Sequence, residues 1–104
     1  MNTDPPISNP DKYKVIFENE RVRVLEYTDK PGDKTTLHHH PDTVTFTLSA
    51  FERKLYSNGQ EKVVVKKAHE AGWQPEQDHV GENIGTTDTH TILVELKEPR
   101  PTNS

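Results

Sequence analysis

The chain has 104 residues and a mass of 11.9 kDa, which predicts one small domain with a single thin core. There are 13 Lys and Arg residues against 17 Asp and Glu residues, so the net charge is −4 and no basic excess favours a nucleic-acid partner. No uninterrupted apolar run exceeds the length of residues 63–65, far short of the roughly 20 residues that span a bilayer.

The two ends of the chain differ in composition from the part between them. Residues 1–12 hold three of the eight prolines and one branched aliphatic side chain, Ile7, which predicts an N-terminal arm. Residues 98–104 are polar and proline-containing and are predicted to be a disordered C-terminal tail. Residues 13–97 remain as a single domain. The chain lacks cysteine and its first residues do not resemble a secretory signal, so a cytoplasmic location is expected.

The first half of this domain predicts strands separated by turns. Residues 14–18 form a short β-branched and aromatic run, and residues 21–28 begin with the alternation typical of a half-buried strand. Pro31 and Gly32 predict a turn between residues 30 and 33, because proline presets φ and glycine accepts a positive φ.

Residues 44–51 alternate between apolar and hydroxyl side chains, which predicts another strand. We expect its apolar face, with Phe46 and Leu48, to fill the interior. The hydroxyl face, formed by Thr45, Thr47 and Ser49, is then expected to lie in solvent or against a partner.

The second half of the domain also predicts strands. Residues 53–56 and 62–66 flank Asn58-Gly59, which is the strongest short-range signal for a β-hairpin. Residues 71–83 look irregular, and residues 90–97 predict a last strand. Its apolar face, formed by Ile92, Val94 and Leu96, is expected to line the core. No stretch of a dozen residues has a helical period, so the predicted fold class is all-β, an antiparallel sandwich or barrel.

Six histidines are present, and His38, His39 and His40 are consecutive. Side chains at i and i+2 of a strand share a face, so His38 and His40 are expected to point inward together and His39 outward. Two imidazoles on one face suit a divalent ion at bond lengths of about 2.0–2.2 Å, with a third ligand from elsewhere in the chain. The alternative interpretation is a polar loop that is merely rich in histidine.

The residues around these histidines resemble the two motifs of a cupin. Residues 32–41 read G-x5-H-x-H-P, and residues 79–85 read H-x3-N-x-G between a Gly-Trp-Gln-Pro turn and the last strand. The resemblance runs from residue 18 to residue 97 and is nearest to the short, single-domain bacterial cupins, many of which have no assigned reaction. It implies a jelly-roll β-barrel of two antiparallel sheets with little or no helix.

The same resemblance implies the metal ligands. The two histidines of the first motif fall on His38 and His40, and the histidine of the second motif falls on His79. The glutamate ligand that normally follows the first pair would fall on Val44 or Thr45, and neither replaces a carboxylate. A site of three histidines is therefore expected, holding one divalent transition metal (Fe, Mn, Ni or Zn, with Fe favoured by the resemblance). Gln77 stands where the second motif normally has glycine.

Three functions are open for such a site. Three neutral imidazoles leave the ion with its full double charge, which favours a small, anionic, bidentate substrate. By resemblance, the leading hypothesis is an Fe(II)-dependent dioxygenase acting on a small chelating acid, diketone or thiol. The second is a non-redox lyase or isomerase with Glu26, Glu82 or Tyr27 as general base. The third is a non-catalytic domain that binds a metal or a small ligand.

Other residues are weaker candidates. His90 is either a buried core histidine or a pocket residue that orients a ligand, and Trp73 is either a core or rim aromatic or a wall of the pocket. His69 is expected to be solvated in a polar turn. Small jelly rolls leave sheet edges that a second copy can cover, and cupins of this type are commonly homodimers, so a homodimer is expected.

Overall fold

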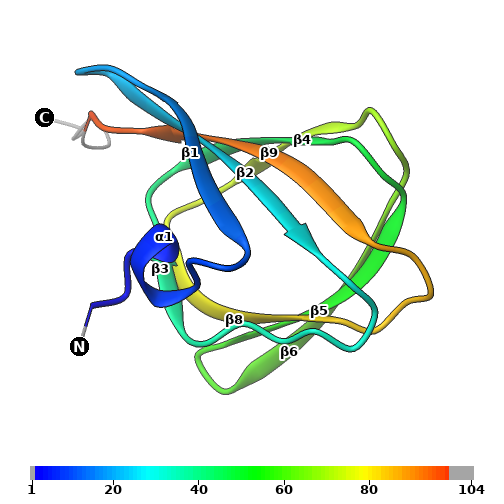
Figure 1. Cartoon of the computed structure of the whole chain (residues 1–104). Coiled ribbons are helices and arrows are strands. Elements are labelled where there is room, and N and C mark those ends of the chain that lie inside the picture. The colour runs from blue at the N-terminus through cyan, green and yellow to red at the C-terminus, as the bar shows by residue number, and fades with distance from the viewer. Residues whose placement is uncertain (1, 99–104) are drawn as a thin grey trace, which may run out of the picture.

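Two antiparallel β-sheets face each other in the computed structural model, which describes residues 2–98 (Figure 1). One sheet has the strand order β1 (Tyr13–Glu18), β2 (Val22–Asp29), β9 (Thr89–Leu96), β4 (Thr43–Thr47) and β7 (Ala71–Gln74). The other has the order β3 (His38–His40), β8 (Gln77–Asn83), β5 (Phe51–Ser57) and β6 (Gln60–Lys66). The predicted all-β jelly roll is thus confirmed.

Helix is limited, within residues 2–98, to the single turn α1 (Pro5–Ser8). No helix in this range has the length and apolarity that crossing a membrane requires. The predicted C-terminal tail lies outside the described residues apart from Glu98.

The predicted turns form as their sequences require. Asn58 and Gly59 have φ angles of 52° and 74°, and they connect Ser57 to its cross-strand partner Gln60. Gly32 has a φ of 89°, in the left-handed region that the turn prediction required. Residues 71–83, expected to be irregular, instead form β7 and β8. Their polar and glycine-rich sequences are held in strands by pairing with β4, β3 and β5.

The inner face of the five-stranded sheet is largely polar, which corrects the predicted orientation of two strands. In β4, Thr43 and Thr47 are buried, whereas Phe46 is 38% exposed. In β9, Leu93 and Glu95 point inward with the threonines, and the alternate apolar residues point outward. The alternation identified both strands, but the side that faces the interior is set by the polar groups that the interior contains.

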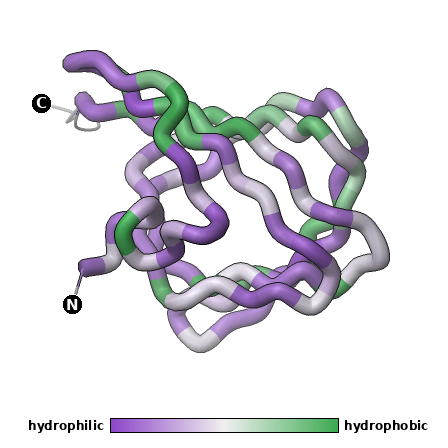
Figure 2. Tube along the Cα trace, in the orientation of Figure 1, coloured by the Kyte–Doolittle hydropathy of each residue, from purple (hydrophilic) through white to green (hydrophobic). Residues whose placement is uncertain are grey.

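An apolar row therefore crosses the outside of this sheet. Its members are paired in register from β1 to β7, and we call them the outer row: Phe17, Val24, Val94, Val44 and Trp73. Figure 2 shows the apolar segments concentrated along this sheet, while the opposite sheet is mostly polar. The two ends of the row are the most exposed, Phe17 at 54% and Trp73 at 57%.

The buried apolar cluster is small and is supplemented by a buried ionic network. Tyr13, Leu25, Tyr27 and Leu93 form the cluster. Beside it, Nη1 of Arg53 donates to Oδ2 of Asp29 at 2.5 Å, and Nη2 of Arg53 donates to the Tyr27 hydroxyl at 3.2 Å. Burying a charge is costly unless it is paired, so Arg53 and Asp29 can be accommodated in the interior only together.

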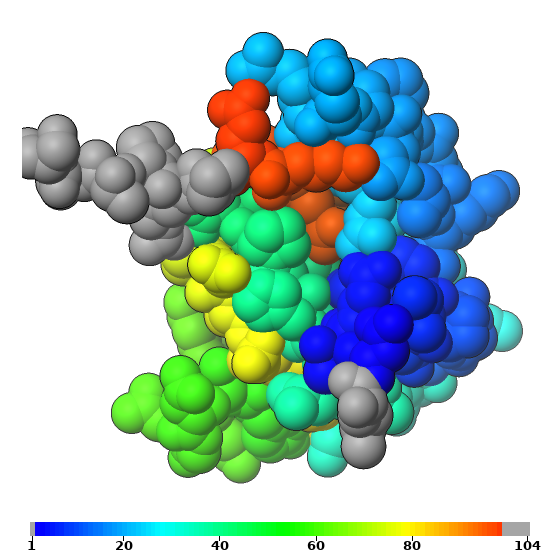
Figure 3. Space-filling view, turned by 90° about the vertical axis from the view of Figure 1, so that its left-hand side faces the viewer, coloured from blue at the N-terminus to red at the C-terminus, as the bar shows by residue number. Residues whose placement is uncertain are grey.

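The N-terminal residues lie against β3 and the first sheet (Figure 3). The backbone N–H of His39 donates to the carbonyl of Thr3 at 2.8 Å, and the side chain of Asn9 accepts from the N–H of Thr36 at 2.9 Å. Asp4 forms a two-pronged ion pair with Arg23 of β2, at 2.6 and 2.9 Å. These contacts join the start of the chain to β3, to the segment just before it and to β2.

Replacing Asp29 by alanine is expected to lower the free energy of unfolding by about 3–5 kcal/mol, because Arg53 then stays buried without its anion. The matched control is Glu61→Ala, which removes a surface partner of Lys54 and should cost less than about 1 kcal/mol. Urea unfolding followed by far-ultraviolet circular dichroism measures both. Equal losses in the two variants would contradict the structural role of the buried pair.

Candidate metal centre

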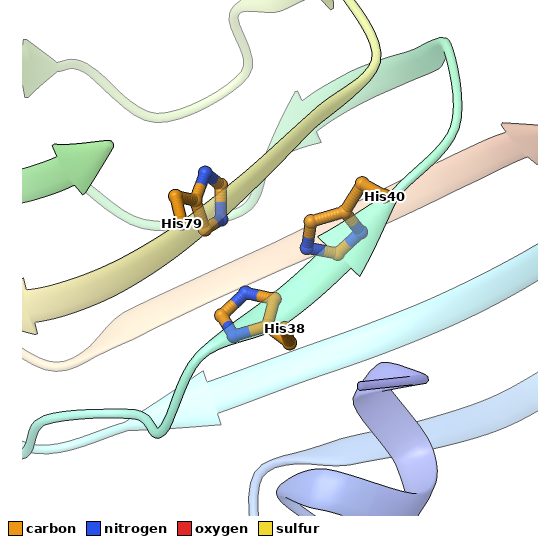
Figure 4. Close-up of side chains that lie close together, drawn as sticks. All are labelled: His38, His40 and His79. Carbon is orange, nitrogen blue, oxygen red and sulfur yellow. The ribbon is translucent and has the colours of Figure 1, made fainter. Parts of the chain in front are cut away.

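Three histidines meet inside the barrel because β3 and β8 pair in register. His38 lies opposite His79 in this pair, and His40 follows on the same face of β3. All three are buried, with exposed fractions of 1%, 0% and 4% for His38, His40 and His79. Their ring centroids are 4.6–5.2 Å apart, and one ligand nitrogen of each lies within 4.8 Å of the others (Figure 4).

Each imidazole uses its Nδ1 atom for a hydrogen bond to an oxygen. The acceptors are the carbonyl of Thr36 for His38 (2.8 Å), the carboxylate of Glu95 for His40 (2.9 Å) and the side-chain amide oxygen of Gln77 for His79 (2.7 Å). Because these oxygens accept, each Nδ1 carries a proton, and Nε2 of the neutral ring keeps a lone pair. Histidines that bind metals typically have this support, which fixes the ring and its tautomer.

The acceptor of His40 belongs to a longer chain of charges. Glu95 is 2% exposed, and its other oxygen accepts from Nε and Nη2 of Arg23 at 2.9 and 2.7 Å. Arg23 in turn holds Asp4 in the N-terminal segment. The carboxylate next to His40 is therefore fixed by the half-buried guanidinium of Arg23.

Burial keeps the imidazoles of His38 and His79 neutral. Together with the nearby histidines, burial lowers the pKa of His38 to about 4 and that of His79 to about 2. At neutral pH the two rings therefore present lone pairs rather than charges. The cluster of three contains no carboxylate, so a divalent ion held there would keep its double charge.

A phenol completes the cluster. The hydroxyl of Tyr13 lies 3.2 Å from Nε2 of His38 and 3.2 Å from Nε2 of His40. Burial raises the pKa of Tyr13 well above its usual range, so the metal-free group is a neutral phenol with one proton. One proton cannot satisfy two lone-pair nitrogens, and the shortage of hydrogen-bond donors is what a bound cation would relieve. The residues present thus fit a divalent metal.

A cavity of about 120 Å³ adjoins the histidines. Thr45, Thr47 and Leu93 line it, so the hydroxyl face expected in solvent forms part of its wall. Two buried polar atoms in the wall, Nε2 of Gln74 and Oγ1 of Thr91, have no hydrogen-bond partner. They are available to a molecule that enters the cavity.

His90 and Trp73, expected as candidates for the pocket, lie outside it. His90 is on the outer face of β9, where its Nε2 contacts Glu26 at 2.7 Å. Trp73 is 57% exposed at one end of the outer row. Both corrections follow from the reversed orientation of their sheet, since His90 shares its face with Ile92 and Val94.

The remaining histidines are at the surface. The side chain of His39 is 39% exposed and contacts Asp78 and Glu76, as its predicted outward direction requires. His69 is exposed in a turn with a φ of 65°, and its ring stacks on Phe46 at 6.1 Å.

Sequence reasoning did not select Tyr13, Glu95 or the acceptor role of Gln77. Glu95 carried a local signal, since it is an acidic residue within the apolar run of residues 92–96. Gln77 was noted only for replacing a glycine, and it now supports His79. Tyr13 carried no local signal, because it is the single buried residue of β1 and reaches the site only through the tertiary fold.

No family model and no curated protein matched the chain. Solved structures do match. A cupin domain from Bordetella pertussis is similar over 83% of this chain and 92% of its own, with 25% identity and a TM-score of 0.77. An uncharacterized double-stranded β-helix protein from Klebsiella pneumoniae matches over 81% and 74%, with 23% identity and a TM-score of 0.65.

An RmlC-like cupin from Methanocaldococcus jannaschii matches over 81% of this chain and 77% of its own, with 14% identity and a TM-score of 0.65. At that identity the likeness concerns the fold alone. Strand order, register and these neighbours agree: the chain has the double-stranded β-helix fold of cupins, and this fold brings together three histidines able to hold a metal ion.

Proposed function

We propose that this cupin binds one divalent transition metal, preferentially Fe(II), through Nε2 of His38, His40 and His79. The observation that carries the proposal is the set of three Nδ1 hydrogen bonds, which leaves three lone pairs in one buried place. When bound, the metal would supply a Lewis acid and a template for a small chelating molecule and O₂. Imidazole ligands suit Fe, Ni and Zn, and iron is preferred here for the reaction argued below.

The proposed substrate is a small anion. An engineered cavity of about 150 Å³ accommodates benzene, so the present 120 Å³ suits a molecule of about six non-hydrogen atoms. Arg53 and Lys66 line the cavity, and a divalent ion held by the histidines adds further positive charge. The unpaired Nε2 of Gln74 donates to a second polar group of the substrate. A small chelating acid meets all these conditions.

The reaction we propose is oxidation by O₂, because the cavity lacks a free base for proton abstraction. Glu26 is paired with His90 and Glu82 accepts from Tyr56, and neither lines the cavity. Tyr27 does line it, but burial raises its pKa well above its usual range, and its hydroxyl donates to Asp29. A lyase or isomerase therefore has no poised group among these candidates.

Anaerobic reconstitution with Fe(II) is expected to load about one ion per chain, measured by elemental analysis. Each of the variants His38→Ala, His40→Ala and His79→Ala should reduce the bound iron at least tenfold, because the two remaining imidazoles do not hold the ion. His39→Ala, His69→Ala and His90→Ala are matched controls that remove an imidazole outside the cluster, and they should bind as the wild type does. Iron retained in the first three variants would contradict the site.

The loaded protein is then screened with small hydroxy acids, 1,3-dicarbonyls and thiol acids for O₂ uptake. Uptake with iron and not with zinc is the expected result, abolished by His79→Ala. Turnover without O₂, with several metals accepted, would instead establish a lyase or isomerase. Stoichiometric metal without turnover of any compound would establish a binding domain and overturn the proposed reaction.

Acid is expected to destabilise the metal-free protein through its neutral histidines. The folded-state pKa of His38, about 4, is below the unfolded value of 6.5, so the unfolded chain binds more protons between these values. Stability is therefore full above pH 6.5 and falls as the pH drops toward 4. This histidine should contribute roughly 2–3 kcal/mol of the loss at pH 4.5.

Urea unfolding at pH 7 and pH 4.5 measures this loss. Because buried carboxylates also titrate in this range, the relevant quantity is the difference between the wild type and His38→Gln. The variant should lose less stability than the wild type on acidification. An equal loss in both proteins would show that His38 is not held neutral.

We also propose that two copies associate through the outer row. The row is uncharged, and an aromatic residue stands at each end with three valines between them. A twofold axis at the central Val94 would therefore place Phe17 of one copy over Trp73 of the other, an isologous contact without buried charge. Exposed apolar patches of this kind typically mark interaction sites.

Light scattering is expected to give twice the chain mass for the wild type and the chain mass for Val94→Lys. The control Val65→Lys alters a valine that is 69% exposed on the opposite sheet, and it should leave the dimer intact. A monomeric wild type, or a dimer that survives Val94→Lys, would exclude this interface.

A further inference from the structure

The hydroxyl of Tyr13 contacts two of the three candidate ligand histidines directly. Its oxygen is equally distant from two of the three candidate ligand nitrogens, at 3.2 Å from Nε2 of His38 and of His40. Tyr13 is the only residue of β1 that is buried, because the other five side chains of the strand are exposed. β1 therefore places one side chain in the interior, and the hydroxyl of that side chain lies at the proposed metal site.

The available hydrogen-bond donors cannot satisfy both contacts of the Tyr13 hydroxyl, the one with His38 and the one with His40. Each of the two imidazoles donates from Nδ1 to an oxygen, so in the neutral form of each ring, the form that binds a metal, Nε2 can only accept. The hydroxyl has one proton and can satisfy one of them. The other contact places two lone pairs 3.2 Å apart, an arrangement that is unfavourable unless a cation lies between them.

The distances agree with a shared cation. Two ligands on one ion, each at about 2.1 Å and separated by an angle of about 100°, lie about 3.2 Å apart. Tyr13 has this separation from both imidazoles. The close packing of its ring against Tyr27, with centroids 4.6 Å apart, and the backbone hydrogen bond from its N–H to Asn9 hold the phenol in place before any ion arrives.

We propose that Tyr13 is a fourth protein ligand of the metal, bound through its phenolate oxygen on the β1 side of the three histidines. This inference rests on the proposed metal site. The phenolate would supply the single negative charge that Val44 and Thr45 do not, so the ion and its protein ligands together carry a charge of +1. Exogenous molecules then approach only from the cavity side.

The binding step involves no electron transfer. The O–H bond of Tyr13 breaks as the oxygen–metal bond forms, and the proton leaves to solvent. The hydrogen bond between the hydroxyl and one imidazole is lost at the same time, since both Nε2 atoms then bind the ion. No oxidant or further reactant is needed, so the step can be observed with the protein and a metal salt alone.

The experiment uses Cu(II) as the probe, because it binds nitrogen and oxygen ligands most strongly among the divalent ions and its phenolate complexes absorb visible light. The wild type with one equivalent of Cu(II) should develop a charge-transfer band. Resonance Raman spectra excited in that band should show tyrosine ring modes that shift when the protein contains ring-deuterated tyrosine. This isotope test needs no substitution and so does not depend on how a variant folds.

Tyr13→Phe removes one oxygen and should abolish the band while weakening Cu(II) binding roughly 10- to 100-fold. The controls use the other two tyrosines. Tyr27→Phe removes a hydroxyl in the same cavity that contacts Asp29 and Arg53, and Tyr56→Phe removes one that contacts Glu82. Both should keep the band.

The outcomes separate this inference from the metal site itself. Stoichiometric Cu(II), lost in His38→Ala, without a band in the wild type would overturn ligation by Tyr13 and leave the three-histidine site in place. A band that persists in Tyr13→Phe would also overturn it. Cu(II) that fails to bind the wild type, or binds equally to His38→Ala, would overturn the proposed metal site instead.

Discussion

Three imidazoles, buried side by side with their Nδ1 atoms fixed by oxygens, are the constraint on which the rest of the interior depends. Burying an imidazole is costly unless its polar atoms are satisfied, and here each ring has one satisfied nitrogen and one that faces its neighbours. The Nδ1 atoms, on the outer side of the cluster, all have hydrogen-bond partners, whereas the centre between the Nε2 atoms has few hydrogen-bond donors. Such an interior is suited to a cation rather than to further packing.

This requirement explains why the inner faces of the sheets are polar. Glu95 accepts from His40, and Arg23 balances the charge of Glu95. Glu95 of β9 and Arg23 of β2 must therefore occupy inward-facing positions of their strands. The apolar residues at the alternate positions of these strands, such as Val24 and Val94, are then placed on the outside by the strict alternation of a strand. A thin core and an apolar exterior are two consequences of one polar interior.

Sequence reasoning succeeded where the signal was local. The i, i+2 spacing placed His38 and His40 together, and Asn58-Gly59 predicted its hairpin. His79 was assigned through the cupin resemblance, since nothing local relates residue 79 to residue 38. The orientation of β4 and β9 was wrong because alternation defines two faces without saying which is inside, and the more apolar face was assumed to be buried. Tyr13 and Glu95 become recognisable only through register.

The N-terminal segment is part of the site rather than an appendage to it. It reaches His40 through Asp4, Arg23 and Glu95, it contacts the backbone of His39 through Thr3, and it leads directly into Tyr13. In the cupin motif that residues 32–41 resemble, a glutamate normally adds a negative charge to the metal ligands, and this chain lacks that glutamate. The structure offers two compensations from elsewhere: a carboxylate one step removed, behind His40, and a phenol beside the imidazoles. Both depend on strands at the edge or centre of the five-stranded sheet, so the electrostatics of the centre are determined by the whole fold and not by the two histidine motifs alone.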